Sequence, residues 1–258
     1  MVIMKFGLNE SLTVSYYKVE SNKIQNTIRI AFITDLHSCY YGEGQEDLLN
    51  CIYEQNPDVV LLGGDIVDDR LPSKNAAITL KALAEKYICY YVSGNHEYRS
   101  GKIDEIKKMI SGYGVVILEG QRDTVNIKQQ LINICGVDDA DVGKSSFFQQ
   151  IVNTEKQADS ALFTIFMAHR PEYIKTYLQY DFDLILAGHA HGGQWRIPGV
   201  VNGLLAPNQG FFPKYAGGEY EFGDKTFIVS RGLARESTRI PRFFNPPEVV
   251  IVDISSIN

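Results

Sequence analysis

Each of the five histidines of this chain lies in a short polar motif, and for all but His169 that motif also contains Asp, Asn, Gly or a second His. Carboxylate, amide and imidazole groups bind transition-metal ions, and imidazole also transfers protons near neutral pH. Any one of these motifs is common in turns, and a single His at such a place is usually bonded to a backbone carbonyl. With one further Gly-Gly-Asp segment, the motifs are Thr34-Asp35-Leu36-His37, Gly63-Gly64-Asp65, Gly94-Asn95-His96-Glu97, Ala168-His169-Arg170-Pro171 and Gly188-His189-Ala190-His191-Gly192.

The placement of the motifs is more informative than their composition. Each one directly follows an apolar run, which is the pattern of a buried strand that ends in a loop. Glycines at these points allow a tight turn and the close approach of the backbone to a bound group. In an extended segment, Asp35 and His37 would point to the same side and present a carboxylate and an imidazole to one ion. The joint pattern predicts one shared site at the strand ends.

The elements that must position these motifs alternate between strand and helix in the first half of the chain. This alternation predicts an α/β fold. The predicted strands are 28–34, 59–62, 88–92, 131–137, 162–168 and 184–187, and the predicted helices are 45–55, 75–86 and 102–111. After Gly192 the helical periodicity disappears, so strands and ordered loops are expected up to Phe222, with a closing strand at 249–254.

Composition limits the class of protein. The chain has 258 residues, is 45% hydrophobic and has no linker or repeat, so we expect one domain over residues 1–258. Its net charge of -6 disfavours nucleic-acid binding. Four scattered cysteines without CxxC spacing favour a reducing compartment, and Cys39 is expected to pack rather than react. Without a leader or an apolar run of spanning length, a cytoplasmic location is expected, while peripheral membrane association and a trimmed anchor stay open.

The motif order DxH, GGD, GNHE, His and GHxH resembles the signature of the calcineurin-like metallophosphoesterases. The resemblance spans Asp35 to His191 and implies a four-layer αββα sandwich of two mixed β-sheets flanked by helices. It also implies two metal ions, of which one would be held by Asp35, His37 and His191. Asn95, His169 and His189 would hold the other, with Asp65 bridging the two. Gly192-Gly193-Gln194 and Asn245-Pro246-Pro247-Glu248 look like the bacterial stand-alone phosphohydrolase branch of this superfamily.

The implied activity is hydrolysis of phosphomonoester, phosphodiester or pyrophosphate bonds by a metal-bridging hydroxide. His96 would protonate the leaving oxygen or stabilise charge, although a histidine that only orients the site is the alternative. Donors of N and O without thiolate suit Mn, Fe, Zn or Co. Asp68 and Asp69 are expected to support the ligands or form a turn.

Substrate recognition is less well determined by the sequence. Guanidinium groups match phosphate oxygens, so Arg99, Arg231 and Arg235 are candidates for binding a phosphorylated small molecule or lipid headgroup. A solvated or salt-bridged role is equally consistent with these arginines. The alternatives for the whole protein are a catalytically silent interaction scaffold and a nuclease of the same superfamily. The substrate, the metal and the oligomeric state are left open.

Overall fold

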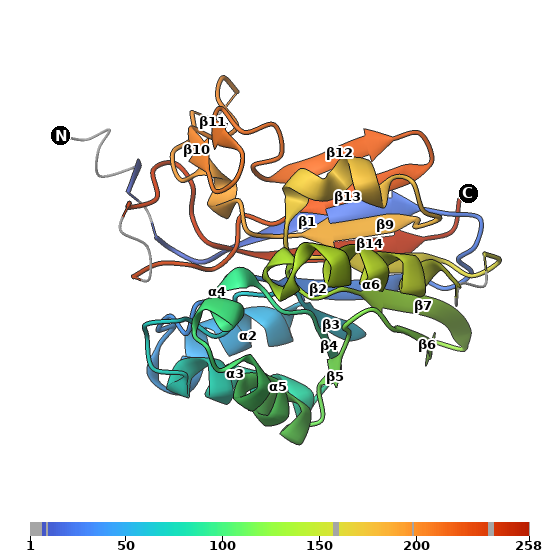
Figure 1. The fold of residues 1–258 in the computed structure, drawn as a ribbon, viewed down its shortest axis with the longest axis horizontal. Coiled ribbons are helices and arrows are strands. Elements are labelled where there is room, and N and C mark those ends of the chain that lie inside the picture. The colour runs from blue at the N-terminus through green and yellow to red at the C-terminus, as the bar shows by residue number, and fades with distance from the viewer. Residues whose placement is uncertain (1–6, 9, 157–159, 198, 237–239, 258) are drawn as a thin grey trace.

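Two six-stranded mixed β-sheets lie face to face and are flanked by helices on both outer sides (Figure 1). The computed structural model describes residues 7–8, 10–156, 160–197, 199–236 and 240–257. The first sheet has the order β1(Thr13–Glu20), β14(Glu248–Ser255), β2(Ile28–Ile33), β3(Val59–Leu62), β4(Ile88–Tyr91) and β5(Val116–Ile117). The second has the order β12(Gly218–Phe222), β13(Lys225–Val229), β9(Leu184–Ala187), β8(Thr164–Met167), β7(Gln130–Gly136) and β6(Arg122–Ile127). The predicted fold class is therefore confirmed.

The centre of each sheet is parallel. Strands β2, β3, β4 and β5 run in one direction, as do β7, β8, β9 and β13 in the second sheet. Within the described parts of these two sheets, antiparallel pairing joins β14 to β2, β12 to β13 and β6 to β7. The central strands β3, β8 and β9 are buried along their whole length, which explains their uninterrupted apolar sequences.

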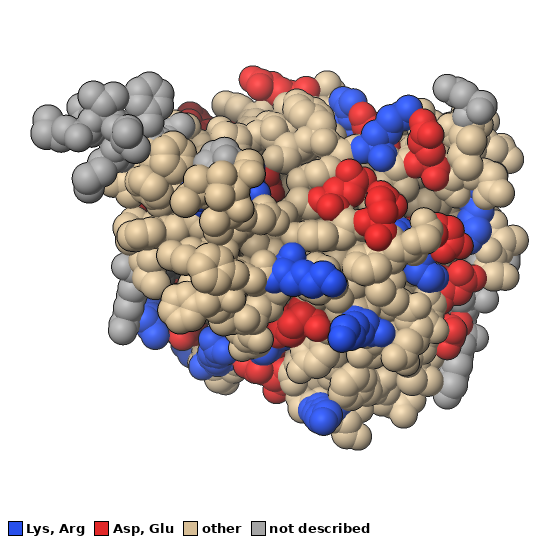
Figure 2. All heavy atoms as spheres, turned by 90° about the horizontal axis from the view of Figure 1, so that it is seen from above, with Lys and Arg blue, Asp and Glu red and all other residues tan. Residues whose placement is uncertain are grey.

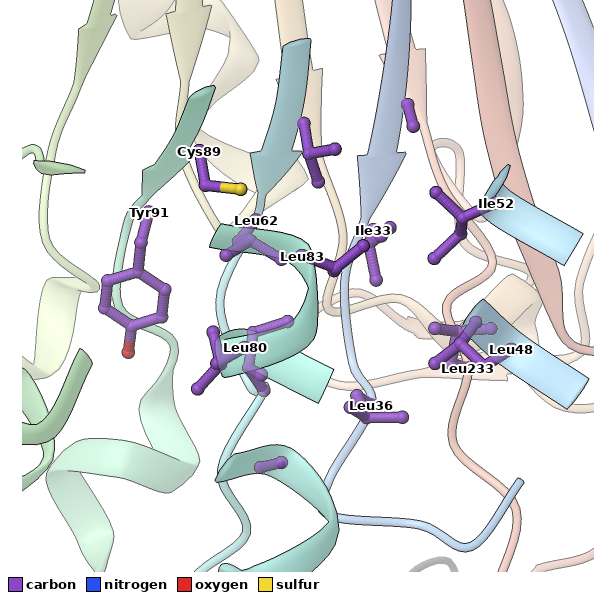
Figure 3. Close-up of a cluster of buried hydrophobic side chains, with 14 of the residues drawn as sticks. Ile33, Leu36, Leu48, Ile52, Leu62, Leu80, Leu83, Cys89, Tyr91 and Leu233 are labelled. Carbon is purple, nitrogen blue, oxygen red and sulfur yellow. The ribbon is translucent and has the colours of Figure 1, made fainter. Parts of the chain in front are cut away.

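Three apolar layers hold the sandwich together. Between the sheets, Phe32 and Leu61 of the first pack with Ile134 and Leu186 of the second. The outer face of the first sheet is covered by α2(Glu46–Glu54), α3(Lys74–Ala84) and α5(Ile103–Gly112). Figure 3 shows Leu80 and Leu83 of α3 near Leu62 and Ile33, and Leu48 of α2 beside Leu233. The outer face of the second sheet is covered by α6(Lys144–Lys156) and α7(Ile174–Tyr177).

The predicted strands and helices agree with the structure to within about two residues at each end. The prediction did not include β1, α4(Asn95–Arg99), β5, β6, α6, α7 or β13. Strand β1 pairs on one side with β14 and exposes alternate side chains, so it lacks the apolar run of a central strand. Helix α6 buries few of its side chains, among them Phe147 and Ile151, and its apolar pattern is correspondingly weak. Among the described residues, no helix is long and apolar enough to cross a membrane.

Candidate metal centre

Five loops from the two sheets meet at the carboxyl ends of their parallel strands. Asp35 and His37 follow β2, Asp65 follows β3, and Asn95 and His96 begin the short helix α4(Asn95–Arg99) after β4. His169 follows β8, and His189 and His191 follow β9 on the second sheet. Apart from His96, whose side chain is 26% exposed, all of these residues are buried. The structure thus brings together every residue for which the sequence predicted a metal-binding or catalytic role.

One group of donors consists of Asp35, His37 and His191. Oδ1 of Asp35 lies 3.9 Å from Nε2 of His37 and 3.5 Å from Nε2 of His191. One donor atom from each of the three residues falls within 4.8 Å of the others. Separations of this size are those of atoms that surround one ion about 2 Å from each.

A second group consists of Asp65, His169 and His189. Oδ2 of Asp65 lies 3.1 Å from Nε2 of His169, which is 3.2 Å from Nδ1 of His189. The same carboxylate oxygen is 3.6 Å from Nε2 of His37, in the first group. Asp65 therefore lies between the two sets of donors, where one carboxylate reaches both.

Asn95 borders the second group. One polar atom of its amide lies 2.8 Å from Nδ1 of His189, and the other lies 2.9 Å from Nη1 of Arg99. Hydrogen bonding within the chain favours Nδ2 toward His189 and Oδ1 toward Arg99. Binding of an ion beside His189 requires the opposite orientation, because only the amide oxygen is a ligand.

The surroundings fix which ring nitrogen faces the centre. Nδ1 of His37 donates to Asp68 at 3.0 Å, and Nδ1 of His169 donates to the carbonyl of Gly63 at 2.9 Å. In both rings Nε2 is then left as the inward acceptor, which is the usual arrangement of a metal-binding histidine. Among the described residues, Nε2 of His37 and Oδ2 of Asp65 are buried without a hydrogen-bond partner. Buried polar atoms rarely lack partners, so these donors fit a metal ion.

The pKa shifts of His189, His191 and Asp65 favour the charge states that bind metals, whereas the pKa values of Asp35 and His169 are raised in the metal-free protein. Burial holds the pKa of His189 well below the usual range, and the nearby His169 lowers it further. Burial likewise lowers the pKa of His191, together with the nearby His37. Burial by itself would raise the pKa of Asp65, but His169 and His37 outweigh it and hold the pKa well below its usual range. Neutral imidazoles and an ionised carboxylate are the forms that bind metals.

The backbone at the ligands is unusual. Asp35, His37, Asp65, His189 and His191 all have φ between 47° and 64°, in the left-handed region that residues other than glycine seldom adopt. The extended conformation predicted for Asp35 and His37 is therefore wrong. The two side chains converge because the chain turns sharply after β2 ends at Ile33, and not because alternate residues share a face of a strand. Strained conformations of this kind concentrate at functional sites.

Glu97 joins two of the loops, a role that the sequence did not reveal. Its carboxylate accepts hydrogen bonds from the backbone N–H groups of Asp65, Ile66, Val67 and Gly94 at distances of 2.7–3.0 Å. Burial and the nearby Asp65 raise its pKa to about 7. The only signal in the sequence was the position of an acidic residue, Glu97, at the end of the motif Gly94-Asn95-His96-Glu97.

His96 lies at the exposed edge of the centre. Nδ1 donates to Asp69 at 2.7 Å and is 3.2 Å from Asp68, while its backbone N–H donates to Oδ1 of Asp65 at 2.7 Å. The two carboxylates fix the ring, and the 26% exposure leaves it accessible from solvent. Asp68 and Asp69 thus support the histidines, as expected from the sequence.

The three candidate arginines lie in different surroundings. Arg99 is next to Asn95, and its Nε is 3.6 Å from Asp141. Arg231 forms a close ion pair with the buried Glu248, to which both Nε and Nη2 donate. Arg235 lies over the ring of Tyr41 and donates to the carbonyl of Tyr40. Only Arg99 of the three is in contact with a proposed metal ligand in the contacts described.

Sequence comparisons match this chain to phosphoesterases. A sequence model described as calcineurin-like phosphoesterase matches residues 28–193, which include all the loops of the centre. A metallophosphoesterase of Campylobacter jejuni is 29% identical over 242 residues, which are 92% of this chain and 61% of the relative. The phosphodiesterase YaeI of Escherichia coli is 28% identical over 211 residues, which are 80% of this chain and 74% of the relative. The chain thus spans less than two thirds of the Campylobacter protein.

A solved structure shares the architecture. The phosphopantetheinyl hydrolase of Mycobacterium tuberculosis superposes with a TM-score of 0.52 and covers 83% of this chain and 92% of its own. Its sequence identity is 12%, so this likeness shows a shared fold and nothing finer.

Proposed function

This chain belongs to the calcineurin-like phosphoesterase family, and we propose that it hydrolyses phosphomonoester, phosphodiester or pyrophosphate bonds with two metal ions. One ion would be held by Asp35, His37 and His191. The other would be held by Asn95, His169 and His189, with Asp65 shared between them. Two bound ions would supply Lewis acidity and lower the pKa of water. The supporting observation is the convergence of buried imidazoles on the central Asp65 carboxylate, 3.1 Å from His169 and 3.6 Å from His37.

His96 is the proposed proton donor. It is the one histidine of the centre with a partly exposed ring, and its Nδ1 is occupied by Asp69. Nε2 is the remaining nitrogen for a leaving oxygen, and a protonated imidazole at this place also stabilises negative charge.

Arg99 is the proposed phosphate-binding arginine. When the oxygen of Asn95 turns toward an ion, the amide N–H₂ faces Nη1 of Arg99, and two donors oppose each other. This repulsion favours rotation of the guanidinium toward a phosphate oxygen. Arg231 and Arg235 are proposed to serve the structure around β1 and β14 and around Tyr41, because their guanidinium groups already have partners there.

Residues 1–258 are proposed to form one domain, because β1 near the start pairs with β14 near the end. In the view of Figure 2, Lys and Arg are interspersed with Asp and Glu over the right half of the molecule, and no continuous basic stripe is visible. A small phosphorylated substrate is therefore favoured over a nucleic acid. The metals proposed remain Mn, Fe, Zn or Co.

The test combines metal analysis with hydrolysis of bis-p-nitrophenyl phosphate and p-nitrophenyl phosphate. The wild-type protein with added Mn²⁺ is expected to hydrolyse at least one ester, and Asp65→Asn and His189→Ala are expected to abolish that activity. Asp224→Asn, in the exposed turn between β12 and β13, is the control and should retain full activity. Bound metal without hydrolysis of either ester would instead support the silent scaffold.

A further inference from the structure

An apolar lobe stands beside the metal centre. It comprises the described residues between Gln194 and Lys214 and includes β10(Leu205–Ala206) and β11(Gly210–Phe211). Five large apolar side chains of this lobe are exposed, with 79% of Val200 and 72% of Phe211 accessible. The five are Trp195, Ile197, Val200, Phe211 and Phe212. Clustered exposure of this kind is unfavourable in water and marks a binding surface.

A small hollow opens in this lobe. It has a volume of about 180 Å³ and lies between Trp195, Leu204, Leu205, Phe211 and Ile240, with Gly193 and Gln194 at its edge. The nearby backbone groups bond to one another: the carbonyl of Gly193 accepts from Leu204, and the carbonyl of Leu204 accepts from Phe212. The hollow is smaller than a typical small-molecule site. It therefore fits an apolar part of a ligand rather than a whole ligand.

The segment that forms the lobe contains cationic but no acidic side chains. The chain contains 31 acidic residues, yet the 35 residues from Leu184 to Gly218 contain no Asp or Glu. Arg196 and Lys214 are the two residues with cationic side chains in the lobe. Figure 2 shows a largely uncharged surface over the centre-left of the view, with charged side chains of both signs along its lower edge. A surface that combines exposed apolar groups with cations complements anionic amphiphiles.

The lobe is physically continuous with the metal centre. Gly193 and Gln194, at the edge of the hollow, follow His191 by two and three residues. In the turn between β10 and β11, Nδ2 of Asn208 lies 3.4 Å from Nε2 of His189 and 2.9 Å from Glu172. The hairpin that exposes Phe211 thus also contacts a proposed metal ligand. A ligand whose phosphate lies at the centre is well placed to extend into the hollow.

We infer that this hollow binds an acyl chain of a lipid phosphoester whose phosphate lies at the metal centre. The inference rests on the proposed phosphoesterase function and specifies its substrate class. A lipid is favoured over a protein partner because Gly193 and Gln194 at the edge of the hollow directly follow the loop of His191, and because the segment that forms the lobe lacks acidic residues. The exposed aromatic side chains would then contact the lipid surface from which the substrate is drawn.

The binding experiment uses Trp195, the single tryptophan of the chain, as the reporter. Dodecylphosphonate is expected to shift the Trp195 emission to the blue at concentrations where methylphosphonate has no effect, because only the long chain can fill the hollow. The double variant Phe211→Ser and Phe212→Ser should lose this response. The control Val116→Ser and Leu131→Ser, which changes exposed apolar residues in β5 and β7, should keep it. Equal emission shifts with the two phosphonates would overturn the inference and would favour a protein partner for the lobe. This outcome does not depend on whether the protein is active.

The kinetic experiment compares dodecyl and methyl esters of p-nitrophenyl phosphate, below the micelle concentration of the former. The wild-type protein should show kcat/KM at least about tenfold higher for the dodecyl ester, since burial of roughly two methylene groups corresponds to that factor. The Phe211→Ser and Phe212→Ser variant should lose the preference, so that the ratio of its kcat/KM values for the two esters falls toward one. Hydrolysis of both esters at equal kcat/KM would reject the acyl-chain site and retain the phosphoesterase. Hydrolysis of neither ester, with the emission shift retained, would reject the phosphoesterase alone.

Discussion

Asp69 accepts a hydrogen bond of 2.7 Å from Nδ1 of His96, and neither residue is among the proposed metal ligands. The neighbouring Asp68 accepts a hydrogen bond of 3.0 Å from Nδ1 of His37, and His37 is a proposed metal ligand. Asp68 also lies 3.2 Å from Nδ1 of His96, so Asp69 is the carboxylate of the two that contacts His96 without contacting His37. Substitution of Asp69 therefore tests the proposed proton-transfer role apart from metal binding.

We predict that Asp69→Asn lowers kcat about ten- to a hundredfold while the metal content stays at the wild-type value. The carboxylate orients the His96 ring and favours its protonated form, and partners of this kind have effects of that size. Activity and metal content of the purified variant are the measurements. Asp104→Asn, exposed on α5, is the matched control. An unchanged kcat would contradict the role assigned to the pair.

Asp68→Asn is expected to act mainly on metal binding. Loss of the carboxylate weakens the orientation of His37, so the metal concentration at half-maximal activity should rise about ten- to a hundredfold. The measurement is a titration of the metal-free protein with Mn²⁺, followed by activity. If Asp68→Asn and Asp69→Asn gave the same titration curve, the division between the two carboxylates would be rejected.

The stability of the metal-free protein should depend on pH through His96. Burial alone would lower the pKa of this ring, but Asp68, Asp65 and Asp69 outweigh burial and raise it from 6.5 to about 9. The folded state then holds the proton more tightly than the unfolded state. The stabilisation is complete below pH 6.5 and is lost as the pH rises through about 9.

Urea unfolding in the presence of a chelator, at a series of pH values, measures this effect. The free energy of unfolding of the wild-type protein should fall more steeply between pH 6.5 and 9 than that of His96→Asn. Parallel curves would show that His96 carries no raised pKa.

Gly64 should be irreplaceable for a reason that Gly101 does not share. Both have positive φ, 88° and 69° respectively. A Cβ at Gly64 would lie 2.7 Å from the backbone N of Gly94 and 2.7 Å from Nδ1 of His169, whereas a Cβ at Gly101 would meet nothing within 4 Å. Gly101→Ala is expected to cost only the backbone term of about 1–2 kcal/mol. Gly64→Ala should cost more and should also weaken metal binding, because two loops of the centre must move.

Urea unfolding and metal titration of both variants test this prediction. Similar losses of stability in the two variants, with metal affinity unchanged, would show that the close approach at Gly64 has no functional importance.

Local sequence was sufficient for the main elements and for the identity of the groups at the centre. The buried strands β3 and β9 were predicted with their observed bounds, because a short apolar run that ends in Gly, Asp or His is readable without any partner. The same pattern placed Asp65 and His189 at strand ends. Strand β1 and helix α6 were missed, since their stability comes from pairing with β14 and from packing on the second sheet.

The tertiary structure alone decided how these groups are arranged. Asp65 and His169 are 104 positions apart and follow strands of different sheets, yet their side chains lie 3.1 Å apart. The left-handed backbone at Asp35 and His37, and the pairing of Arg231 with Glu248, likewise have no local signal. Sequence periodicity reports which side chains are buried, because burial follows the repeat of a strand or helix. The distances and partners within a site depend on how separate elements pack, and that packing is a property of the whole fold.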